Sequence, residues 1–243
     1  MDVAGIRYSL VIPCYNESEG LPDLVNRCDE LLEQLDESEV LLVNNGSTDN
    51  SGSVFRSLGL PSERIRVVDV SENKGYGHGI LSGLQEAKGE VIGWTHADLQ
   101  TDPMDFKLAV DLINEEGLSG GNFIVKGRRV GRPLGDLIFT AGMSLFETIL
   151  LRTPMRDINA QPTVFDRDSM LSWVDQAPAD FSLDLFVYFQ ARQLRAAVRR
   201  FPVFFTDRRH GHSRWNFSWK SKMMFIRRTV AFSFSLARSL SRI

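Results

Sequence analysis

The chain has 243 residues and is 43% apolar, which is enough to bury a sizeable core, and α/β enzymes of this length commonly form one domain. Its two cysteines, Cys14 and Cys28, exclude a disulfide framework and a cysteine-based zinc site, and the N-terminal residues do not resemble a cleavable signal peptide. We therefore expect a protein of a reducing, cytoplasmic compartment.

The net charge of −3 is unevenly distributed along the chain. Residues 201–243 carry nine Lys or Arg against a single acid, Asp207, so the C-terminal part is basic and the rest is acidic. A basic end indicates contact with an anionic surface or a phosphate-bearing substrate, although a solvated basic helix gives the same pattern. We expect no nucleic-acid partner, and the sequence leaves the oligomeric state open.

Short apolar runs alternate with segments of helical period through the first half of the chain. The runs that predict buried strands are 7–13, 39–45, 64–70, 90–95 and 121–127. The segments that predict helices are 21–36, 49–58, 78–88 and 103–116, and Gly59, Gly89 and Gly117 are placed to end three of them. This alternation predicts an α/β fold with a mostly parallel central sheet flanked by helices.

The second half of the sequence is less regular. The apolar segment 134–151 contains Asp136 and Glu147, which make it too interrupted for a membrane span, and we expect a packed core helix rather than a helix on a membrane surface. The elements predicted after it are a loop at 152–162, a helix at 181–194, a strand at 198–205 and a loop at 206–216. The basic end, 217–243, has a helical mixture of apolar and basic residues, and it either lies on a membrane surface or covers the sheet.

The loops after the strands are the places to look for function, because ligands of parallel sheets lie beyond the carboxyl ends of the strands. The first four loops are rich in Gly, Asn, Asp, Ser or His: PCYNESEG, NNGSTDNSG, SENKGYGHG and HADLQTDP. Gly75, Gly77 and Gly79 suggest a dinucleotide fingerprint, but their spacing is wrong and they follow the third strand instead of the first. This argues against a dehydrogenase.

The fourth loop gathers polar groups directly after a buried strand. In an extended segment, alternation puts His96, Asp98 and Gln100 on one side. Oxygen ligands that leave room for water suit Mg²⁺ or Mn²⁺, so the loop predicts a metal site. Asp102, followed by Pro103, has the pattern of a helix N-cap.

The four loops, in this order and at these intervals, resemble the successive motifs of family 2 glycosyltransferases, which have the GT-A nucleotide-diphospho-sugar transferase fold. Within that family they are most similar to the dolichyl- and polyprenyl-phosphate sugar transferases. The resemblance covers residues 7–127 and, through R-x-x-G-x-S-R at 208–214, part of the later chain. It implies a GT-A domain at 1–216, with a nucleotide-sugar-binding half (1–127) and an acceptor half (128–216), before a basic amphipathic helical segment at 217–243.

The resemblance implies that the first loop opens the nucleotide-sugar pocket. Pro13, Tyr15, Asn16 and Glu17 stand where the pocket of the family begins, and Glu17 can accept hydrogen bonds from the ribose or the base. The alternative role of Glu17 is that of an acid at a helix entry, which the helix dipole favours.

The second motif of the family usually reads V-D-D-G-S-x-D, and here Asn44 and Asn45 replace the two acids while Asp49 is retained. A carboxylate only accepts hydrogen bonds, whereas an amide both accepts and donates, so the nucleotide base stays open. Asp49 also fits a helix N-cap. In the third motif, Lys74 is placed to reach a phosphate and Gly75 to let the backbone approach the nucleotide, although a turn into a helix explains the glycines equally well.

HADLQ stands where the family has D-A-D-L-Q, whose two acids hold a divalent cation on the donor diphosphate. The resemblance therefore places Ala97 and Asp98 at the nucleotide sugar and makes Asp98 both a metal ligand and a catalytic residue, with His96 and Gln100 as further ligands. Because His96 replaces the first acid, the site favours Mn²⁺ over Mg²⁺. We assign Asp102 mainly to capping.

A phosphate acceptor is already negatively charged and needs cations rather than a general base. The candidates that follow the fifth strand or lie in the later loop are Lys126, Arg128, Arg129, Arg132, Arg208, Ser213 and Arg214. Asp157 stands where the family has an acid, and it is the candidate base if the acceptor is a hydroxyl. An ion pair of Asp157 with Arg156 or Arg128 is the alternative.

We therefore expect an inverting, metal-dependent glycosyltransferase that moves a sugar from a nucleoside diphosphate to a polyprenyl phosphate or another lipid-linked or surface-glycan acceptor. It would be cytoplasmic or attached peripherally to the inner face of a membrane through its basic C-terminus. The alternatives are a soluble transferase to a sugar hydroxyl and a nucleotide-binding homologue without catalysis, since Asn44, Asn45 and His96 replace motif acids.

Overall fold

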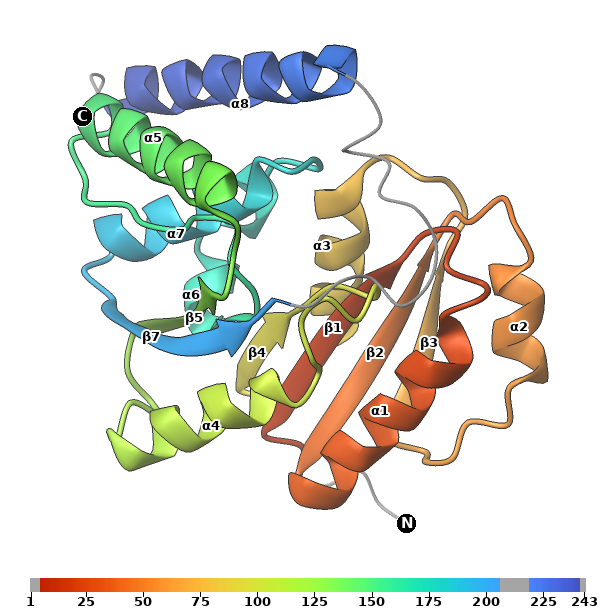
Figure 1. The fold of residues 1–243 in the computed structure, drawn as a ribbon. Coiled ribbons are helices and arrows are strands. Elements are labelled where there is room, and N and C mark those ends of the chain that lie inside the picture. The colour runs from red at the N-terminus through yellow and green to blue at the C-terminus, as the bar shows by residue number, and fades with distance from the viewer. Residues whose placement is uncertain (1–4, 206–218, 241–243) are drawn as a thin grey trace.

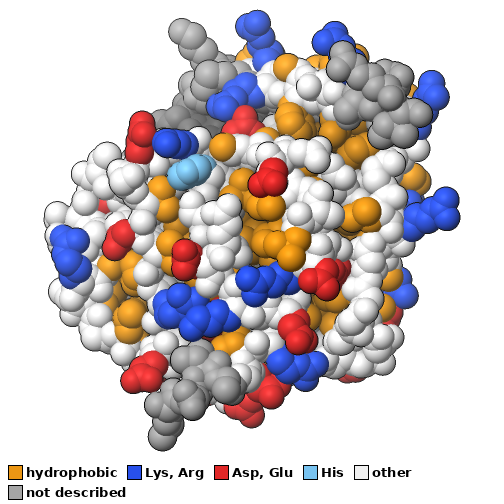
Figure 2. Space-filling model, turned by 180° about the vertical axis from the view of Figure 1, so that it is seen from behind, with side chains coloured by type: hydrophobic (Ala, Val, Ile, Leu, Met, Phe, Trp, Pro, Cys, Tyr) orange, Lys and Arg blue, Asp and Glu red, His pale blue; other side chains and the backbone are white. Residues whose placement is uncertain are grey.

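The computed structural model describes residues 5–205 and 219–240, and these form a seven-stranded sheet with helices on both faces (Figure 1). The strands are β1 (Tyr8–Cys14), β2 (Ser38–Asn45), β3 (Ile65–Val70), β4 (Val91–Trp94), β5 (Phe123–Val130), β6 (Thr163–Asp166) and β7 (Ala197–Phe204). The helices are α1 (Leu21–Gln34), α2 (Ser51–Ser57), α3 (Tyr76–Glu86), α4 (Asp105–Glu115), α5 (Leu134–Leu150), α6 (Arg167–Leu171), the 3-10 turn η1 (Val174–Gln176), α7 (Leu183–Gln193) and α8 (Trp219–Leu240). Acidic, basic and apolar side chains are interspersed on the face turned away from that view (Figure 2). The predicted elements of the first half are confirmed.

The sheet has the strand order β3-β2-β1-β4-β6-β5-β7. The strands β1 to β4 are parallel to one another and β5 is parallel to β7, whereas β6 is antiparallel to both of its neighbours. The predicted mostly parallel sheet is therefore confirmed, with β6 as an element that the sequence did not predict. Successive strands extend from β1 toward β3 on one side, while β4 lies on the other side of β1. Ligands of α/β sheets bind at such a switch point, beyond the carboxyl ends of the strands.

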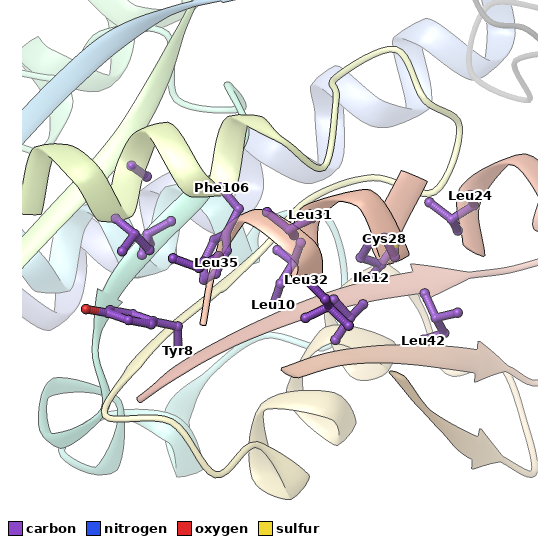
Figure 3. Close-up of a cluster of buried hydrophobic side chains, with 14 of the residues drawn as sticks. Tyr8, Leu10, Ile12, Leu24, Cys28, Leu31, Leu32, Leu35, Leu42 and Phe106 are labelled. Atoms are coloured by element: carbon purple, nitrogen blue, oxygen red, sulfur yellow. The ribbon is translucent and has the colours of Figure 1, made fainter. Parts of the chain in front are cut away.

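The core consists of a buried cluster on each face of the sheet, because successive side chains of a strand point to opposite faces. On one face, Leu10 and Ile12 of β1 belong to a cluster with Leu31 of α1 and Phe106 of α4 (Figure 3). On the other face, Val11 belongs to a cluster with side chains of α3 and α7. Since β1 is buried on both faces, the loop that follows it starts from a rigid platform.

Helix α5 contradicts the predicted packed core helix. Most of its side chains are exposed, and its buried positions are polar, Ser144 and Glu147. It lies beside α8 at one end of the molecule, away from the sheet (Figure 1). None of the described helices has the length and apolar character that a membrane crossing needs. The apolar content of 134–151 suggested burial in the core, but the structure places that content on the surface.

Strand β7 forms one edge of the sheet, with β5 as its neighbour. It contains Pro202, which has no N–H to give to a neighbouring strand. Proline is tolerated within sheets mainly at edge strands, which agrees with this position.

The first prediction concerns Gly83, where α3 packs directly on β1 and β2. A Cβ at Gly83 would lie 2.4 Å from Cγ1 of Val11 and 2.7 Å from Cγ2 of Val43. We expect Gly83→Ala to lower the free energy of unfolding by about 1–3 kcal/mol, although alanine is the better helix former, because the core would be overpacked. Urea denaturation measures the change.

Gly142 in α5 is the matched control, because a Cβ there meets nothing within 4 Å. Gly142→Ala should raise the free energy of unfolding by about 0.5–1 kcal/mol through helix propensity alone. Equal stabilisation by both substitutions would mean that α3 is not held this close to the sheet.

Candidate functional site

Hydrogen bonds tie the first two loops together at the carboxyl edge of the sheet. Oδ1 of Asn16 accepts the N–H of Thr48 at 2.8 Å, and the N–H of Asn16 donates to Oγ of Ser47 at 3.1 Å. Oδ2 of Asp49 accepts the N–H of Ser18 at 3.3 Å. Asp49 precedes the N-cap residue of α2 instead of being that residue. Asn16 and Asp49 therefore set the relative position of the two loops.

Pro13, Tyr15 and Glu17 lie at the switch point between β1 and β4, each partly exposed. The N–H of Glu17 donates to Oγ of Ser51 at 3.0 Å, so the second loop also orients this residue. The first loop thus presents a proline, an aromatic ring and a carboxylate at the edge where a ligand would bind.

The two amides that replace the motif acids face opposite sides of β2. Nδ2 of Asn45 donates to the carbonyl oxygen of Gly75 at 3.0 Å, and the side chain is buried, with its amide 2.7 Å from where a Cβ on Gly79 would lie. Nδ2 of Asn44 donates to Oδ1 of Asp69 at 2.8 Å. Asn45 therefore holds the third loop from within the core, whereas Asn44 is partly exposed.

The Asp69 contact decides how the Asn44 amide is oriented. A carboxylate can only accept hydrogen bonds, so the amide nitrogen of Asn44 faces Asp69. Oδ1 of Asn44 is buried and has no hydrogen-bond partner among the described residues. The pair thus fixes which end of the Asn44 amide is the donor and which is the acceptor.

The glycines of the third loop make room for protein backbone. A Cβ at Gly75 would lie 2.4 Å from the carbonyl oxygen of Ala179, and one at Gly77 would lie 2.5 Å from that of Pro178. The N–H of His78 donates to the carbonyl oxygen of Ala179 at 2.8 Å. The close approach at these glycines is therefore to the segment 178–180, which the sequence did not associate with this loop.

In the fourth loop, burial alternates as predicted, since Ala97 and Leu99 are buried whereas His96, Asp98 and Gln100 are partly exposed. The segment is a turn instead of the expected extended stretch, with Leu99 at a φ of 55°. The buried hydroxyls of Thr95 and Thr101 lie 3.0 Å apart and close the base of the loop. Oδ1 of Asp98 accepts the N–H of Gln100 at 3.2 Å. The three candidate ligands therefore share the open side of a short, closed loop.

Arg27 of α1 holds the outer side of this loop, a role that the sequence did not reveal. Its Nε donates to Oδ1 of Asp102 at 2.8 Å, and its Nη2 donates to Oδ2 at 2.6 Å. Oδ1 of Asp102 also accepts the N–H of Met104 at 2.9 Å, so Asp102 stabilises the turn before α4. The N-cap residue of α4 is Met104, whereas the sequence predicted Asp102. Two fixed ends, the threonine pair and this bidentate pair, restrict the conformation of residues 96–100.

The candidate metal ligands fit an ion that is shared with a bound anion. Within residues 5–205 and 219–240 there is no group of three or more His, Cys, Asp or Glu side chains gathered to hold a metal. His96, Asp98 and Gln100 can therefore supply only part of a coordination shell. Mg²⁺ and Mn²⁺ suit such a site, because their remaining ligands are commonly phosphate oxygens and waters.

A column of three rings leads from His96 to Phe181, in the segment before α7. The ring of Tyr76 stacks on that of His96 with centroids 5.5 Å apart, and on that of Phe181 at 4.5 Å with an interplanar angle of 3°. Burial raises the pKa of Tyr76, with the charges of Asp184 and Asp98 adding to this shift. The tyrosine is therefore a neutral spacer between the fourth loop and the segment before α7.

Asp157 pairs with Arg129, and not with Arg156 or Arg128 as the alternative reading had it. Oδ2 of Asp157 accepts the backbone N–H of Arg129 at 3.0 Å, and Oδ1 accepts from Nε at 2.9 Å. Burial works to raise the pKa of Asp157, but the hydrogen bonds and charge of Arg129 outweigh it and lower that pKa. A carboxylate held in this way is a weak base.

Lys126 corrects the set of predicted acceptor cations. Its side chain is fully buried, with Nζ 3.7 Å from Oδ1 of Asp184 and hydrogen-bonded to Thr163, and burial lowers its pKa to about 8. It cannot contact an acceptor in solution. Arg128 is exposed, and Arg129 lines a pocket that also contains Phe181.

Arg132 donates to Oγ1 of Thr140 at 2.9 Å and is mostly covered. The remaining predicted acceptor residues, Arg208, Ser213 and Arg214, lie outside the described residues. The structure thus brings the four loops together at one edge of the sheet, and Phe181 at the end of the ring column lines a pocket with Arg129. It says nothing of the later basic loop.

Comparison with known proteins gives a family and a fold. Residues 9–180 match the family Glycosyl transferase family 2. An uncharacterized glycosyltransferase, YkcC, of Bacillus subtilis (strain 168) is 37% identical over 111 residues, which are 45% of this chain and 33% of that protein. The undecaprenyl-phosphate 4-deoxy-4-formamido-L-arabinose transferase of Sodalis glossinidius is 35% identical over 112 residues, 45% of this chain and 34% of that protein. The matches span about a third of the length of these relatives.

Two solved structures share the fold at low sequence identity. Glucosyl-3-phosphoglycerate synthase from Mycobacterium tuberculosis, solved with Mn²⁺, UDP and glucosyl-3-phosphoglycerate, has a TM-score of 0.69 at 17% identity, over 96% of this chain and 80% of that one. Mannosyltransferase PcManGT from Pyrobaculum calidifontis, solved with GDP-Man and Mn²⁺, has a TM-score of 0.63 at 20% identity, over 84% of this chain and 58% of that one. These likenesses confirm the predicted GT-A fold.

The Asn44–Asp69 pair generates the second prediction. Asn44→Asp would place two carboxylates at hydrogen-bond distance, and their repulsion should lower the melting temperature, most strongly at low ionic strength. The double variant Asn44→Asp with Asp69→Asn restores a donor opposite an acceptor and should recover most of the loss. Calorimetry of the four proteins measures the coupling, and additive effects of the two substitutions would argue against the pair.

Proposed function

Since the chain belongs to glycosyl transferase family 2, we propose that it is an inverting glycosyltransferase that moves a sugar from a nucleoside diphosphate to a polyprenyl phosphate, with Mn²⁺ or Mg²⁺ as cofactor. The observation that carries the proposal is the open side of the fourth loop. There, His96, Asp98 and Gln100 share one side of a loop that is closed by two threonines, at the switch point of the sheet.

The donor would lie across the first four loops. Glu17 and Asn44 would line the pocket for the ribose and the base, and Lys74, which is largely exposed, would reach the phosphates. Asp98 would bind the cation, with His96 and Gln100 beside it, and the cation when bound neutralises the departing diphosphate. Two of the similar solved structures contain Mn²⁺ with a nucleotide or nucleotide sugar, which supports this assignment.

A phosphate acceptor agrees with the state of Asp157. This carboxylate has its oxygens engaged by Arg129 and a lowered pKa, so it is poorly suited to deprotonate a sugar hydroxyl. A phosphate needs no base and would be attracted by the exposed Arg128. The name of one curated relative contains undecaprenyl phosphate, which is an acceptor of this chemical class. The basic segment 217–243 would hold the enzyme at the cytoplasmic face of a membrane.

A second candidate is transfer to a hydroxyl of a soluble, phosphate-bearing molecule. It is favoured by the structural likeness to a synthase that was also solved with phosphoglyceric acid. Labelled sugar separates the two candidates: transfer to polyprenyl phosphate gives a product that partitions into organic solvent, whereas a soluble product stays in water. Transfer to soluble acceptors alone would contradict the lipid-phosphate proposal.

Asp98 provides the third prediction. Asp98→Asn keeps the shape of the side chain but removes its charge, and it should lower sugar transfer by about 100-fold or more. In the wild type, a nucleoside diphosphate with Mn²⁺ should raise the melting temperature, because both bind only the native state, and the variant should lose most of this shift.

Asp111→Asn is the matched control, since Asp111 pairs with Lys107 on the surface of α4. It should transfer sugar at the wild-type rate. A wild-type protein that binds nucleotide but neither transfers nor hydrolyses any donor sugar would instead be a binding protein of this fold.

Tyr76 provides the fourth prediction, because its ring supports His96. Tyr76→Ala should weaken Mn²⁺ binding in the presence of a nucleoside diphosphate by about tenfold, the usual effect of losing a residue behind a metal ligand. Tyr76→Phe keeps the stack and should bind Mn²⁺ like the wild type. Electron paramagnetic resonance of free Mn²⁺ measures the affinity without sugar transfer.

Phe232→Ala is the control for general destabilisation, since Phe232 packs against the same core cluster as Tyr76, but its ring contacts Phe186, edge-to-face at 6.5 Å, instead of His96. It should lower the melting temperature and leave Mn²⁺ affinity unchanged. Equal Mn²⁺ affinity of Tyr76→Ala and the wild type would remove the proposed support of His96.

A further inference from the structure

Helix α5 has its polar side inward and its apolar side outward. Its inner side chains make hydrogen bonds: Oγ of Ser144 accepts the N–H of Asp157 at 3.1 Å, and Oγ1 of Thr148 accepts the N–H of Met155 at 2.9 Å. Glu147 is fully buried, and its Oε1 accepts from Oγ of Ser233 in α8 at 2.6 Å. These contacts fix the rotation of the helix about its axis.

The outer side of α5 is a continuous apolar stripe. Its members are separated by about one or two helical turns and are 61–72% exposed: Leu134, Ile138, Leu145 and Ile149. Leu137 and Phe139 beside them are also exposed. A contiguous exposed apolar surface on a folded protein marks a site of contact with a partner or a membrane.

Cationic side chains surround the stripe. Arg128 and Arg152 are exposed near the two ends of α5, in the segments that precede and follow it. Helix α8 lies beside α5 (Figure 1), with a ring contact between Phe146 and Phe234 at 6.3 Å, and its Arg227 and Arg228 are exposed. Asp136 is the acid of the first turn of α5. An apolar surface with a cationic border complements an anionic, apolar layer.

We propose that α5 lies in the headgroup region of an anionic membrane, with Leu134, Ile138, Leu145 and Ile149 among the acyl chains and α8 lying beside it at the surface. A second copy of the chain fits less well, because a two-fold contact through the stripe would bring the same arginines together. The inference adds α5 to the basic segment of the proposed function, which contains α8. It holds whether or not the acceptor is a lipid.

Sedimentation with vesicles of phosphatidylglycerol and phosphatidylcholine tests the proposal on the full chain. The wild type should bind these vesicles and bind pure phosphatidylcholine more weakly. Its binding should weaken as salt rises from about 0.1 M to about 1 M, since the screening length falls from about 10 Å to about 3 Å. Absence of binding to the anionic vesicles would overturn the proposal.

Ile138→Glu and Leu145→Glu should each lower vesicle binding by about tenfold, because each replaces a side chain that would be buried in lipid. Their melting temperatures and their binding of a nucleoside diphosphate with Mn²⁺ should equal those of the wild type. Leu171→Glu is the matched control, since Leu171 is 62% exposed on α6, outside the stripe, and its binding should not change.

Two results would overturn the assignment to a membrane. One is wild-type vesicle binding by Ile138→Glu and Leu145→Glu together. The other is a wild-type protein that is a dimer in light scattering and does not bind vesicles, and whose dimer dissociates with the same two substitutions. That result would make the stripe an interface between two copies of the chain. Neither result depends on sugar transfer, so the failure of this inference is distinguishable from the failure of the proposed function.

Discussion

The contact between the third loop and residues 178–180 is the one on which the arrangement of the molecule depends. It joins backbone to backbone, since the carbonyl oxygens of Pro178 and Ala179 occupy the space that side chains would fill at Gly75 and Gly77. Phe181, next along the chain, then reaches Tyr76 and through it His96. The relative position of the third loop and residues 178–181 follows from two missing Cβ atoms.

The connection of this segment to α8 is weaker. Asp180 accepts from Arg228 at 2.8 Å, but the arginine side chain is 62% exposed, and such pairs contribute at most about 1 kcal/mol. Packing and the backbone contact therefore set the position of residues 178–181, and the ion pair orients α8 over a segment that is already in place.

The sequence predicted the first half of the fold because local signals there agree with one another. Each buried strand is followed by a polar loop and an amphipathic helix, and the alternation at 96–100 was visible without any long-range information. Strand β6 escaped prediction because it has only four residues and is defined by antiparallel pairing with β4 and β5. The prediction for α5 failed because apolar content does not say which side of a helix meets water. The inward side is decided by the partners of Ser144 and Glu147, of which Ser233 is far away in the sequence.

The sequence predicted the residues of the candidate site where a motif specifies the position. It predicted them less well where the role of a residue depends on a neighbour that is distant in the sequence. Lys126 was taken for an acceptor cation because it follows a run of strand residues, yet Asp184 and Thr163 bury its charge. The importance of Arg27 was invisible, since an arginine on an amphipathic helix is usually a surface charge until Asp102 is seen beside it. Likewise, the donor and acceptor ends of Asn44 became distinguishable only with Asp69 as a neighbour.

The edge strand β7 bears on how these molecules behave when crowded together. An open sheet edge can pair with the edge of another molecule and start aggregation, and natural proteins discourage this with proline and charge. Strand β7 carries Pro202 together with Arg199 and Arg200. A protein gathered on a surface meets its own copies far more often than in dilute solution. The same strand that completes the sheet thus protects it from being extended by a neighbouring molecule.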